Sequence, residues 1–392
     1  MAQSGEKKIF FLLYSMNLGG VEKSFTSLLS EIKYVPYDIH VGLVFPKGEL
    51  LSLLPSNITI HAINDFSEHW KELKNPPLMT IKNYFTIGHI FNATIACFIY
   101  LCCKVWGSNY LWIQYILRNA KGLKESFDVA IAYAGPTADL DYYLCKKIKA
   151  NVKCGWVHFD ISRFGIDSGM TKQLYKLYNR IFIVSETGKE IFDKTFPQFS
   201  NKTEVFHNIV SPSQIRDMAK IGESYKDDFS GKRILTLGRI SPEKGQVIAI
   251  QAFAILVKKV PNLRWYFIGH GIDLDNCKKE AKDLGVKDKV VFLGLKTNPY
   301  AYIRDCDIFV QPSRHEGYCI SLREALCFGN PIVATDFTGA REQLKNRENG
   351  FVVGMDAESI AAGIEQALLS QKIQDVIDSE DNDIHKLLDL IN

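Results

Sequence analysis

Two glutamates stand eight residues apart in a short run that joins two apolar segments. The run, residues 311–329, reads QPSRHEGYCISLREALCFG and carries Glu316 and Glu324. Apolar residues 307–310 precede it and residues 330–334 begin another apolar segment, so we expect strand, loop, helix and strand in succession. Ligands of open α/β sheets bind at strand ends of this kind. The two carboxylates are therefore candidates for ligand binding.

A structural role is the alternative for both glutamates. Ser321 and Glu324 have the spacing of a capping box, which predicts a helix from about Ser321 to Gly329, just before Pro331. In that interpretation Glu324 bonds back to the start of its own helix, and Glu316 is a solvated loop carboxylate. The run by itself supports both interpretations equally.

A pair of cations follows another predicted strand, residues 233–238. Arg239 and Lys244 lie on the loop after this strand, and Gly245 opens a helix. Two cations beside a helix start suit a diphosphate, whereas two solvated surface bases are the alternative. Because this loop and Glu316 are expected at the same kind of edge in one domain, together they indicate a ligand with a phosphate and many hydroxyls.

The amino-terminal half contributes two further candidates. Gly19 and Gly20 lie between a strand at 8–14 and a helix, where they could let the backbone approach a phosphate or sugar; turn geometry alone can also require both glycines. His158 directly follows a predicted strand at a carboxyl end that a ligand could reach, and a core or capping histidine is the alternative.

These candidates need elements to position them, and alternating strand and helix patterns supply two sets. A length of 392 residues predicts two domains. We place an amino-terminal Rossmann-like domain at 1–207 and a carboxyl-terminal one at 208–375, each a doubly wound parallel α/β sheet. The tail, 376–392, is expected to be helical and to pack back on the first domain.

Composition and motifs exclude several classes of protein. The net charge of +3 is too small to favour nucleic acid as a partner. Nine cysteines show neither zinc-site spacing nor disulfide density, so we expect reduced thiols. No secretion signal is evident at the amino terminus. The absence of a complete G-x-G-x-x-G after a strand and of a P-loop argues against dinucleotide oxidoreductases and P-loop NTPases.

Residues 73–124 differ from the rest of the chain in composition. They contain no Asp or Glu, six Lys or Arg, and many aromatic residues. The 21 uncharged residues between Lys82 and Lys104 are interrupted by polar residues, so we do not expect a membrane span. The region predicts contact with an anionic membrane surface, and ordinary core helices are the alternative.

Taken together, these motifs resemble the retaining glycosyltransferases of the GT-B fold, specifically glycosyltransferase family 4. Residues 311–329 match that family's signature of two glutamates separated by seven residues. The other matching segments are Gly-Gly-Val-Glu at 19–22, Trp-Val-His-Phe-Asp at 156–160, Val-Ser-Glu at 184–186, Gly-Arg-Ile-Ser-Pro-Glu-Lys-Gly at 238–245, Asn-Pro-Tyr at 298–300 and Pro-Ser-Arg-His-Glu-Gly at 312–317.

The resemblance implies two Rossmann-like domains that face each other across a cleft. The carboxyl-terminal domain would hold a nucleotide-sugar donor, and the amino-terminal domain an acceptor. Arg239 and Lys244 would hold the diphosphate, Glu324 the ribose hydroxyls and Glu316 the transferred sugar. No metal or other cofactor is expected, since fixed cations can stabilise the leaving diphosphate.

The resemblance also implies roles for smaller groups. The backbone amides of Gly317, Tyr318 and Cys319 would donate to the sugar or phosphate. Gly19 or Gly20 would close over the diphosphate from the other domain, and His158 would lie near the sugar C6 hydroxyl. Relatives often carry Phe-Gly or Phe-Pro at positions 318–319, a difference that bears on which sugar fits.

The sequence thus predicts a cytoplasmic glycosyltransferase, peripheral on the inner face of the cell membrane through residues 73–124. It would transfer a sugar from a nucleotide diphosphate donor to a lipid-linked saccharide in cell-surface polysaccharide synthesis. One alternative is a soluble GT-B enzyme, such as a sugar-nucleotide epimerase or a small-acceptor transferase. A catalytically inactive binding subunit is the other.

Overall fold

The structure is a computed structural model that describes residues 7–32, 37–163, 165–374 and 383–391. These residues form two compact α/β units. The amino-terminal unit comprises the described residues as far as Val184, Gly188–His207 and the segment from Asp383; the carboxyl-terminal unit comprises Ser185–Thr187 and the described part of Asn208–Asn382. Because each unit is defined by itself, the cleft predicted between the domains stays a prediction.

Within the described residues, a seven-stranded parallel sheet forms the centre of the amino-terminal unit. The strand order is β3-β2-β1-β4-β5-β6-β7, so the first strand lies inside the sheet between β2 and β4. This reversal of direction is the switch point at which doubly wound proteins bind ligands. The strands are β1 (Lys7–Leu13), β2 (Tyr37–Leu43), β3 (Thr59–Ala62), β4 (Ser126–Ala132), β5 (Lys149–Val157), β6 (Arg180–Ile183) and β7 (Thr203–Val205).

Helices cover this sheet on both faces, because the side chains of its inner strands are apolar on both sides and must be shielded from water. The strand β1, KKIFFLL, is buried from Ile9 onward. The helices are α1 (Gly20–Ile32), α2 (Asn64–Ser67), α3 (Trp70–Lys74), α4 (Pro77–Thr86), α5 (Ile90–Trp106), α6 (Tyr110–Ile116), α7 (Ala138–Lys147), α8 (Ser168–Tyr175), α9 (Glu186–Thr195) and α17 (Ile384–Ile391), with 3-10 turns η1 (Leu51–Leu53), η2 (Leu117–Asn119) and η3 (Pro197–Lys202).

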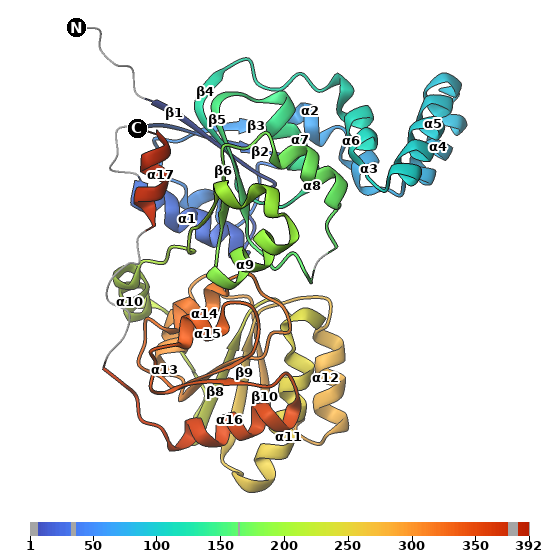
Figure 1. The fold of residues 1–392 in the computed structure, drawn as a ribbon. Helices are drawn as coiled ribbons and strands as arrows, with labels where there is room; N and C mark the ends of the chain where they lie inside the picture. The colour runs from blue at the N-terminus through green and yellow to red at the C-terminus, as the bar shows by residue number, and fades with distance from the viewer. Residues whose placement is uncertain (1–6, 33–36, 164, 375–382, 392) are drawn as a thin grey trace, which may run out of the picture. The chain divides into compact units, whose positions relative to one another are not determined.

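The helix α17 lies in the amino-terminal unit although it follows the whole carboxyl-terminal unit in the chain. It packs against α1 and β4, and Figure 1 shows it in red beside the blue α1. Leu387 and Ile391 are its buried residues. Just before it, Asp383 accepts hydrogen bonds from the backbone N and the Nδ1 of His207, at 2.7 and 2.9 Å.

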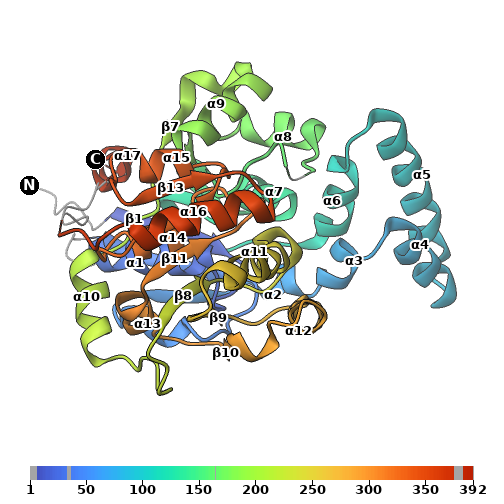
Figure 2. The same cartoon turned by 90° about the horizontal axis from the view of Figure 1, so that it is seen from below.

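The helices α4 and α5 form a hairpin that stands away from the sheet of their own unit, as Figures 1 and 2 both show. A small separate cluster, which includes Tyr84, Ala93 and Trp112, holds the hairpin against α6. Much of its outer surface is apolar and exposed, namely Leu78, Met79, Phe85, Ile87, Ile90, Phe91, Phe98, Leu101, Val105 and Trp106. Among the described helices, none combines the length and apolar character needed to cross a lipid bilayer.

The described carboxyl-terminal unit contains a six-stranded parallel sheet of order β10-β9-β8-β11-β12-β13. The first strand, β8, again lies inside, between β9 and β11, so the loops after β8 and β11 begin at a switch point. The strands are β8 (Lys232–Leu237), β9 (Leu263–Ile268), β10 (Val290–Gly294), β11 (Ile308–Gln311), β12 (Ile332–Thr335) and β13 (Gly350–Val353).

Two hydrophobic clusters cover the two faces of this second sheet. One contains side chains from α10, α13, α14 and α15, and the other contains side chains from α11, α12 and α16. The helices are α10 (Pro212–Ile221), α11 (Gln246–Lys259), α12 (Leu274–Asp283), α13 (Tyr300–Asp305), α14 (Ile320–Ala325), α15 (Ala340–Leu344) and α16 (Ala357–Leu369), with 3-10 turns η4 (Pro242–Lys244) and η5 (Lys287–Lys289). The predicted α/β class with two parallel sheets is confirmed.

The helix predicted from about Ser321 to Gly329 begins within one residue of the predicted start but ends four residues earlier than predicted. The structure has α14 at Ile320–Ala325, with Cys319 as its N-cap residue and no side-chain hydrogen bond at that cap. Ser321 is therefore inside the helix and the predicted capping box does not form. Turns follow the helix before β12, so Pro331 lies well beyond its end.

Candidate functional site

A salt bridge joins the two loops that the sequence singled out in the carboxyl-terminal half. Lys244, at the end of η4, places Nζ 2.6 Å from Oε1 of Glu316, which follows β11. Ser313 donates its hydroxyl to the same oxygen at 2.7 Å. Gln311 in turn donates Nε2 to the Ser313 hydroxyl at 2.8 Å, which orients it. The alternative of a solvated Glu316 is therefore wrong, since its side chain is only 11% exposed.

Backbone contacts fix these two loops against each other. The amide of Arg314 donates to the carbonyl of Glu243 at 2.8 Å. Gly245 has φ +71°, and a Cβ there would lie 1.9 Å from the carbonyl oxygen of Pro312. Only glycine satisfies both the left-handed backbone and this close approach. The loop after β8 is thus seated on the loop after β11 at the switch point.

Arg239 lies on the same loop as Lys244, five residues earlier. Its side chain is exposed, and within the described ranges it makes no ion pair or side-chain hydrogen bond. Burial lowers the pKa of Lys244, whereas the charge of Glu316 and the hydrogen bond to it raise that pKa, and the net pKa is raised. The Lys244 ammonium therefore stays charged.

A tyrosine, rather than the helix cap, holds the second glutamate. Glu324 lies in α14 and is 2% exposed. Tyr300, the first residue of α13, donates its hydroxyl to Glu324 Oε1 at 2.9 Å. Burial, then the charge of Glu324, raises the pKa of Tyr300 well above its usual range, so the hydroxyl stays protonated and remains a donor. The carboxylate is thus held by a bond across two helices.

The segment that follows Glu316 is anchored through its carbonyl oxygens. Ser185 donates its hydroxyl to the carbonyl of Gly317 at 3.3 Å, and Asn208 donates Nδ2 to the carbonyl of Tyr318 at 3.2 Å. Cys319 is buried, and burial raises the pKa of its thiol, so it does not act as a thiolate at neutral pH. These contacts hold the 317–318 backbone through its carbonyl oxygens, and the approach of the 317–319 amides to a ligand stays a prediction.

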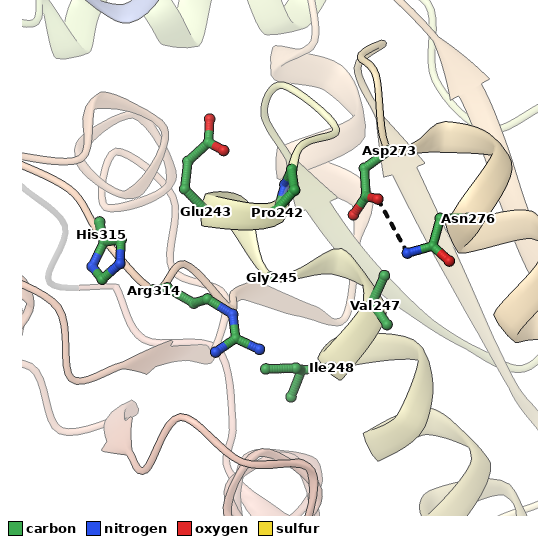
Figure 3. Close-up of a pocket in the computed structure, with 9 residues that line it drawn as sticks. All are labelled: Pro242, Glu243, Gly245, Val247, Ile248, Asp273, Asn276, Arg314 and His315. Atoms are coloured by element: carbon green, nitrogen blue, oxygen red, sulfur yellow. Dashed lines mark hydrogen bonds between the residues drawn. The ribbon is translucent and has the colours of Figure 1, made fainter. Parts of the chain in front are cut away.

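A pocket of about 530 Å³ opens beside the same two loops (Figure 3). It is lined by Pro242, Glu243, Gly245, Val247, Ile248, Asp273, Asn276, Arg314 and His315. In it, Asn276 donates Nδ2 to Asp273 at 3.1 Å. None of the predicted site residues lines this hollow, although Lys244 and Glu316 are neighbours in sequence of residues that do. The chemistry points to the Lys244–Glu316 pair and not to the hollow itself.

The amino-terminal candidates lie at carboxyl ends of their own sheet. Gly20 begins α1, and a Cβ on Gly19 would lie 2.3 Å from the Glu22 carboxylate. His158 follows β5 and is buried, with its ring 4.8 Å from that of Tyr133. Burial lowers the pKa of His158 to about 3, so the ring is neutral at physiological pH. Neither ring nitrogen has a hydrogen-bond partner among the described residues.

The structure therefore joins some of the predicted residues and leaves others apart. It brings Lys244 to Glu316 and has Arg239 on the same loop as Lys244, whereas Gly19, Gly20 and His158 belong to the other unit. Their approach to the donor stays a prediction. Sequence reasoning missed two residues. One is Ser313, a hydroxyl-bearing residue three positions before Glu316 in the quoted segment 312–317. The other is Tyr300, which lies in the quoted Asn-Pro-Tyr segment.

Two sheets of this topology, with a cation pair and two held glutamates at the switch point of the second, define an α/β protein of the GT-B kind. The solved structure of Anabaena Alr3699/HepE in complex with UDP-glucose has a TM-score of 0.65 to this chain, at 16% identity, and the match covers 92% of this chain and 89% of the other. That likeness confirms the predicted GT-B fold.

Residues 219–381 match the family model described as Glycosyl transferases group 1, and this part of the chain belongs to that family. The predicted resemblance to family 4 is thereby confirmed. The chain is 29% identical over 205 residues to the Campylobacter jejuni N-acetylgalactosamine-N,N'-diacetylbacillosaminyl-diphospho-undecaprenol 4-alpha-N-acetylgalactosaminyltransferase, covering 50% of this chain and 54% of the relative. It is 31% identical over 142 residues to the Rhizobium meliloti lipopolysaccharide core biosynthesis glycosyltransferase LpsE, covering 36% and 41%. The chain spans about half the length of the curated relatives it matches.

Proposed function

We propose that the protein is a retaining glycosyltransferase that moves a sugar from a nucleoside diphosphate donor to a lipid-linked saccharide in cell-surface polysaccharide synthesis. The observation that carries the proposal is the Lys244–Glu316 pair at the switch point between β8 and β11, with Arg239 on the same loop as Lys244. A fixed ammonium and a fixed carboxylate side by side suit a ligand that presents a diphosphate next to a polyol.

Lys244 and Arg239 act on the leaving group. Breaking the bond between a sugar and a diphosphate places growing negative charge on the phosphate oxygens, and preorganised cations stabilise that charge. In the free protein Glu316 neutralises Lys244 at 2.6 Å. With donor bound, Nζ of Lys244 lies between the carboxylate and the phosphate, so the charge is already in place before reaction. The chain's own cations thus supply the charge that such a step needs.

Glu316 and Glu324 divide the donor between them. The carboxylate of Glu316, oriented by Ser313, accepts hydrogen bonds from hydroxyls of the transferred sugar. Glu324, oriented by Tyr300, accepts from the ribose hydroxyls. Backbone amides at 317–319 add donors to the sugar or phosphate. A buried, oriented carboxylate discriminates strongly, because a ligand without the matching hydroxyl leaves it unpaired.

Retention follows from attack on the face that the diphosphate leaves. In that step the acceptor hydroxyl forms the new bond to the sugar carbon, its proton goes to the departing phosphate oxygen, and the bond to the diphosphate breaks. No enzyme carboxylate bonds to the sugar, so the paired-carboxylate logic of retaining hydrolases does not apply. In this proposal neutral His158 contributes a hydrogen bond near the sugar C6 hydroxyl.

The exposed hairpin of α4 and α5 supports a membrane-bound acceptor. It presents large apolar side chains, such as Phe91 at 78% and Val105 at 81% exposure, together with exposed Lys82 and Lys104. An apolar surface with flanking cations binds anionic lipid. The Campylobacter relative is named for a saccharide on diphospho-undecaprenol. We therefore place the protein on the inner face of the cell membrane.

The test is a transfer assay with a panel of nucleoside diphosphate sugars and an undecaprenyl diphosphate-linked saccharide. We expect one donor to release its nucleoside diphosphate, with NMR showing the anomeric configuration retained in the product. The variant Arg239→Ala should slow the reaction at least tenfold, since one oriented cation is worth about 2–4 kcal/mol. The matched control is Lys220→Ala, which removes an exposed lysine paired with Asp217.

Other results would favour the alternatives. Conversion of a nucleotide sugar with no acceptor present would indicate an epimerase, and full activity on a soluble acceptor would indicate a small-acceptor transferase. Tight donor binding without turnover of any donor would indicate a binding subunit. Inversion of the anomeric centre would contradict the retaining mechanism.

A further inference from the structure

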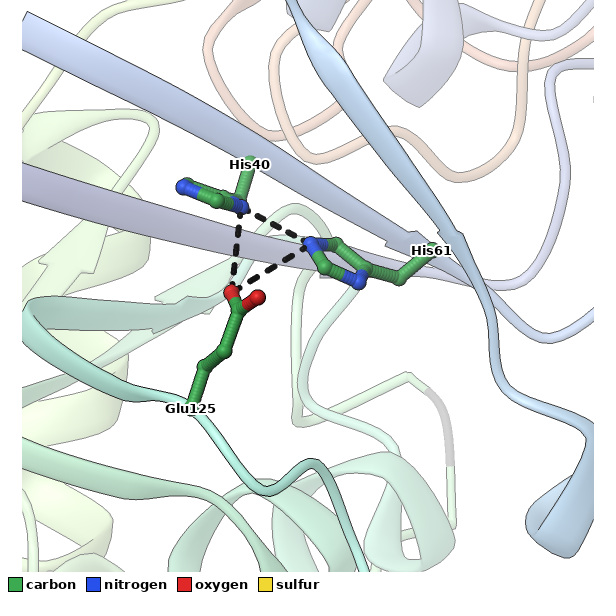
Figure 4. Close-up of side chains that lie close together, drawn as sticks. All are labelled: His40, His61 and Glu125. Carbon is green, nitrogen blue, oxygen red and sulfur yellow. Dashed lines mark hydrogen bonds and ion pairs between the residues drawn. The ribbon is translucent and has the colours of Figure 1, made fainter.

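Two histidines and a glutamate converge in the amino-terminal unit, and none of them is among the residues that the proposed reaction uses. His40 comes from β2, His61 from β3 and Glu125 from the residue just before β4. Figure 4 shows their nitrogen and oxygen atoms pointing toward one another. The Nδ1 of His40 lies 2.8 Å from the Nε2 of His61, and the Glu125 Oε2 lies 3.6 and 3.9 Å from these two atoms.

These distances fit a small metal ion. A point equidistant from the three atoms lies about 2.0 Å from each, which is the length of zinc bonds to histidine nitrogen and carboxylate oxygen. Two imidazoles and one carboxylate form a ligand set that zinc accepts, with a water in the fourth position. Glu125 is 47% exposed at its side chain, which provides a path for an ion from solvent.

A second carboxylate supports this arrangement from behind. The Nε2 of His40 lies 3.0 Å from Oδ2 of Asp38. Metal-bound histidines are typically held in this way, because the carboxylate keeps the proton on the far nitrogen and leaves the near one as a ligand. The Nζ of Lys8 lies 3.6 Å from the same Asp38 oxygen.

The alternative is a pair of histidines joined by a hydrogen bond, and the short distance between their nitrogens fits that arrangement. The 2.8 Å between the two nitrogens is shorter than the separation of about 3.3 Å expected of two nitrogens on one tetrahedral zinc. In the metal-free protein one proton on His61 Nε2 links the rings. Metal binding moves that proton to His61 Nδ1 and turns the rings slightly apart, and no proton is released. The bond between the two rings does not require Glu125, yet Glu125 Oε2 faces both nitrogens.

We propose that His40, His61 and Glu125 form a binding site for a divalent transition-metal ion, with zinc as the ion that fits best. The site ties the edge strand β3 and its neighbour β2 to the segment that leads into β4. It is structural, because its ligands lie outside the candidate active site. Metal should therefore raise thermal stability and leave the transfer step unchanged.

The test uses the full chain, stripped with chelator and titrated with zinc chloride by calorimetry. We expect one zinc per chain and a higher melting temperature with zinc than with EDTA. His61→Ala should abolish the binding. Glu125→Gln is at an exposed position and should keep the fold, but it should weaken zinc binding at least about tenfold. Removing a residue that only hydrogen-bonds to a metal ligand already weakens metal binding by about that factor. His69→Ala is the matched control, since His69 pairs with Glu72 at 2.8 Å but faces no second histidine.

Cobalt substitution separates this site from binding by thiols. Cys97 and Cys102 are partly exposed free thiols and could take up zinc. Cobalt in the proposed site should give the visible bands of a nitrogen and oxygen ligand set, without a thiolate charge-transfer band. The proposal is overturned if no zinc binds, if Glu125→Gln binds as tightly as the parent, or if the cobalt complex shows thiolate ligation. A failure of sugar transfer would leave this result unaffected, because neither readout depends on activity.

Discussion

Removing Lys244 should separate the observed task of this residue, holding Glu316, from its proposed task, stabilising the leaving diphosphate. The side chains of the pair are 23% and 11% exposed, so Lys244→Ala leaves a largely buried carboxylate without its cation. The variant should lose about 1–3 kcal/mol of unfolding free energy, which lies between the small effect of breaking an exposed salt bridge and the large effect of breaking a buried one. Catalysis should fall by about 2–4 kcal/mol, which is roughly 30- to 1,000-fold in kcat/KM.

The double variant Lys244→Ala with Glu316→Gln provides the decisive comparison. A neutral amide in place of the carboxylate removes the unpaired charge, while Ser313 can still donate to the amide oxygen. Stability should therefore recover by about 1–2 kcal/mol, and activity should not. Urea unfolding of the four proteins in the cycle gives the first quantity, and release of nucleoside diphosphate gives the second.

Two results would refute this reasoning. Lys244→Ala with unchanged kcat/KM on the correct donor would show that the ammonium does not meet the diphosphate. Recovery of activity together with stability in the double variant would show that Lys244 acts only by holding the loop. Glu316→Gln alone should lower kcat/KM while costing little stability, since Lys244 can turn toward solvent.

Three further perturbations test the remaining assignments. Tyr300→Phe should raise the KM for the donor about tenfold with a smaller effect on kcat, because a hydrogen bond to the Glu324 carboxylate is worth about 1.5–3 kcal/mol. Steady-state kinetics measure both constants. An unchanged KM would count against the proposed ribose role of Glu324. Phe91→Asp should cut binding to anionic vesicles at least about tenfold in a flotation assay, whereas Ile272→Asp, at an even more exposed apolar residue of the other unit, should not. Burial lowers the pKa of His158 to about 3 in the folded protein, so as pH falls below about 6.5 the unfolded chain takes up the proton before the folded one does and stability should fall. His158→Gln should flatten that part of the curve of unfolding free energy against pH. An unaltered curve would contradict the burial argument.

Much of the fold could be predicted because parallel strands buried on both faces leave a strong apolar signal. The strands predicted at 233–238 and 307–310 correspond to β8 and β11, and each differs from the observed bounds by one residue at either end. The cap and the end of α14 could not be predicted from spacing alone. Ser321 and Glu324 satisfied a capping pattern, yet Glu324 is buried and bonds to Tyr300, a contact between residues 24 positions apart. Local patterns do not contain such a partner.

The candidate site shows the same division. The types and spacing of Lys244 and Glu316 were enough to nominate them, because each follows a strand of the same sheet. Their salt bridge depends on which strands are neighbours, and the order β9-β8-β11 is a property of the folded sheet. The histidine cluster gave no sequence signal at all, since its three ligands are scattered over 86 positions in the chain between His40 and Glu125.

The placement of α17 sets an order of completion during synthesis. All described residues of the carboxyl-terminal unit emerge from the ribosome before Asp383, whereas the amino-terminal unit still lacks the helix that packs on α1 and β4. Domains usually complete their folding in chain order, whereas here the amino-terminal unit receives its last helix only after the described residues of the carboxyl-terminal unit have been synthesised. Until α17 arrives, the surface that later covers Leu387 and Ile391 is open to water. A nascent chain stalled before residue 383 should thus be a ready client for chaperones that recognise exposed apolar surface.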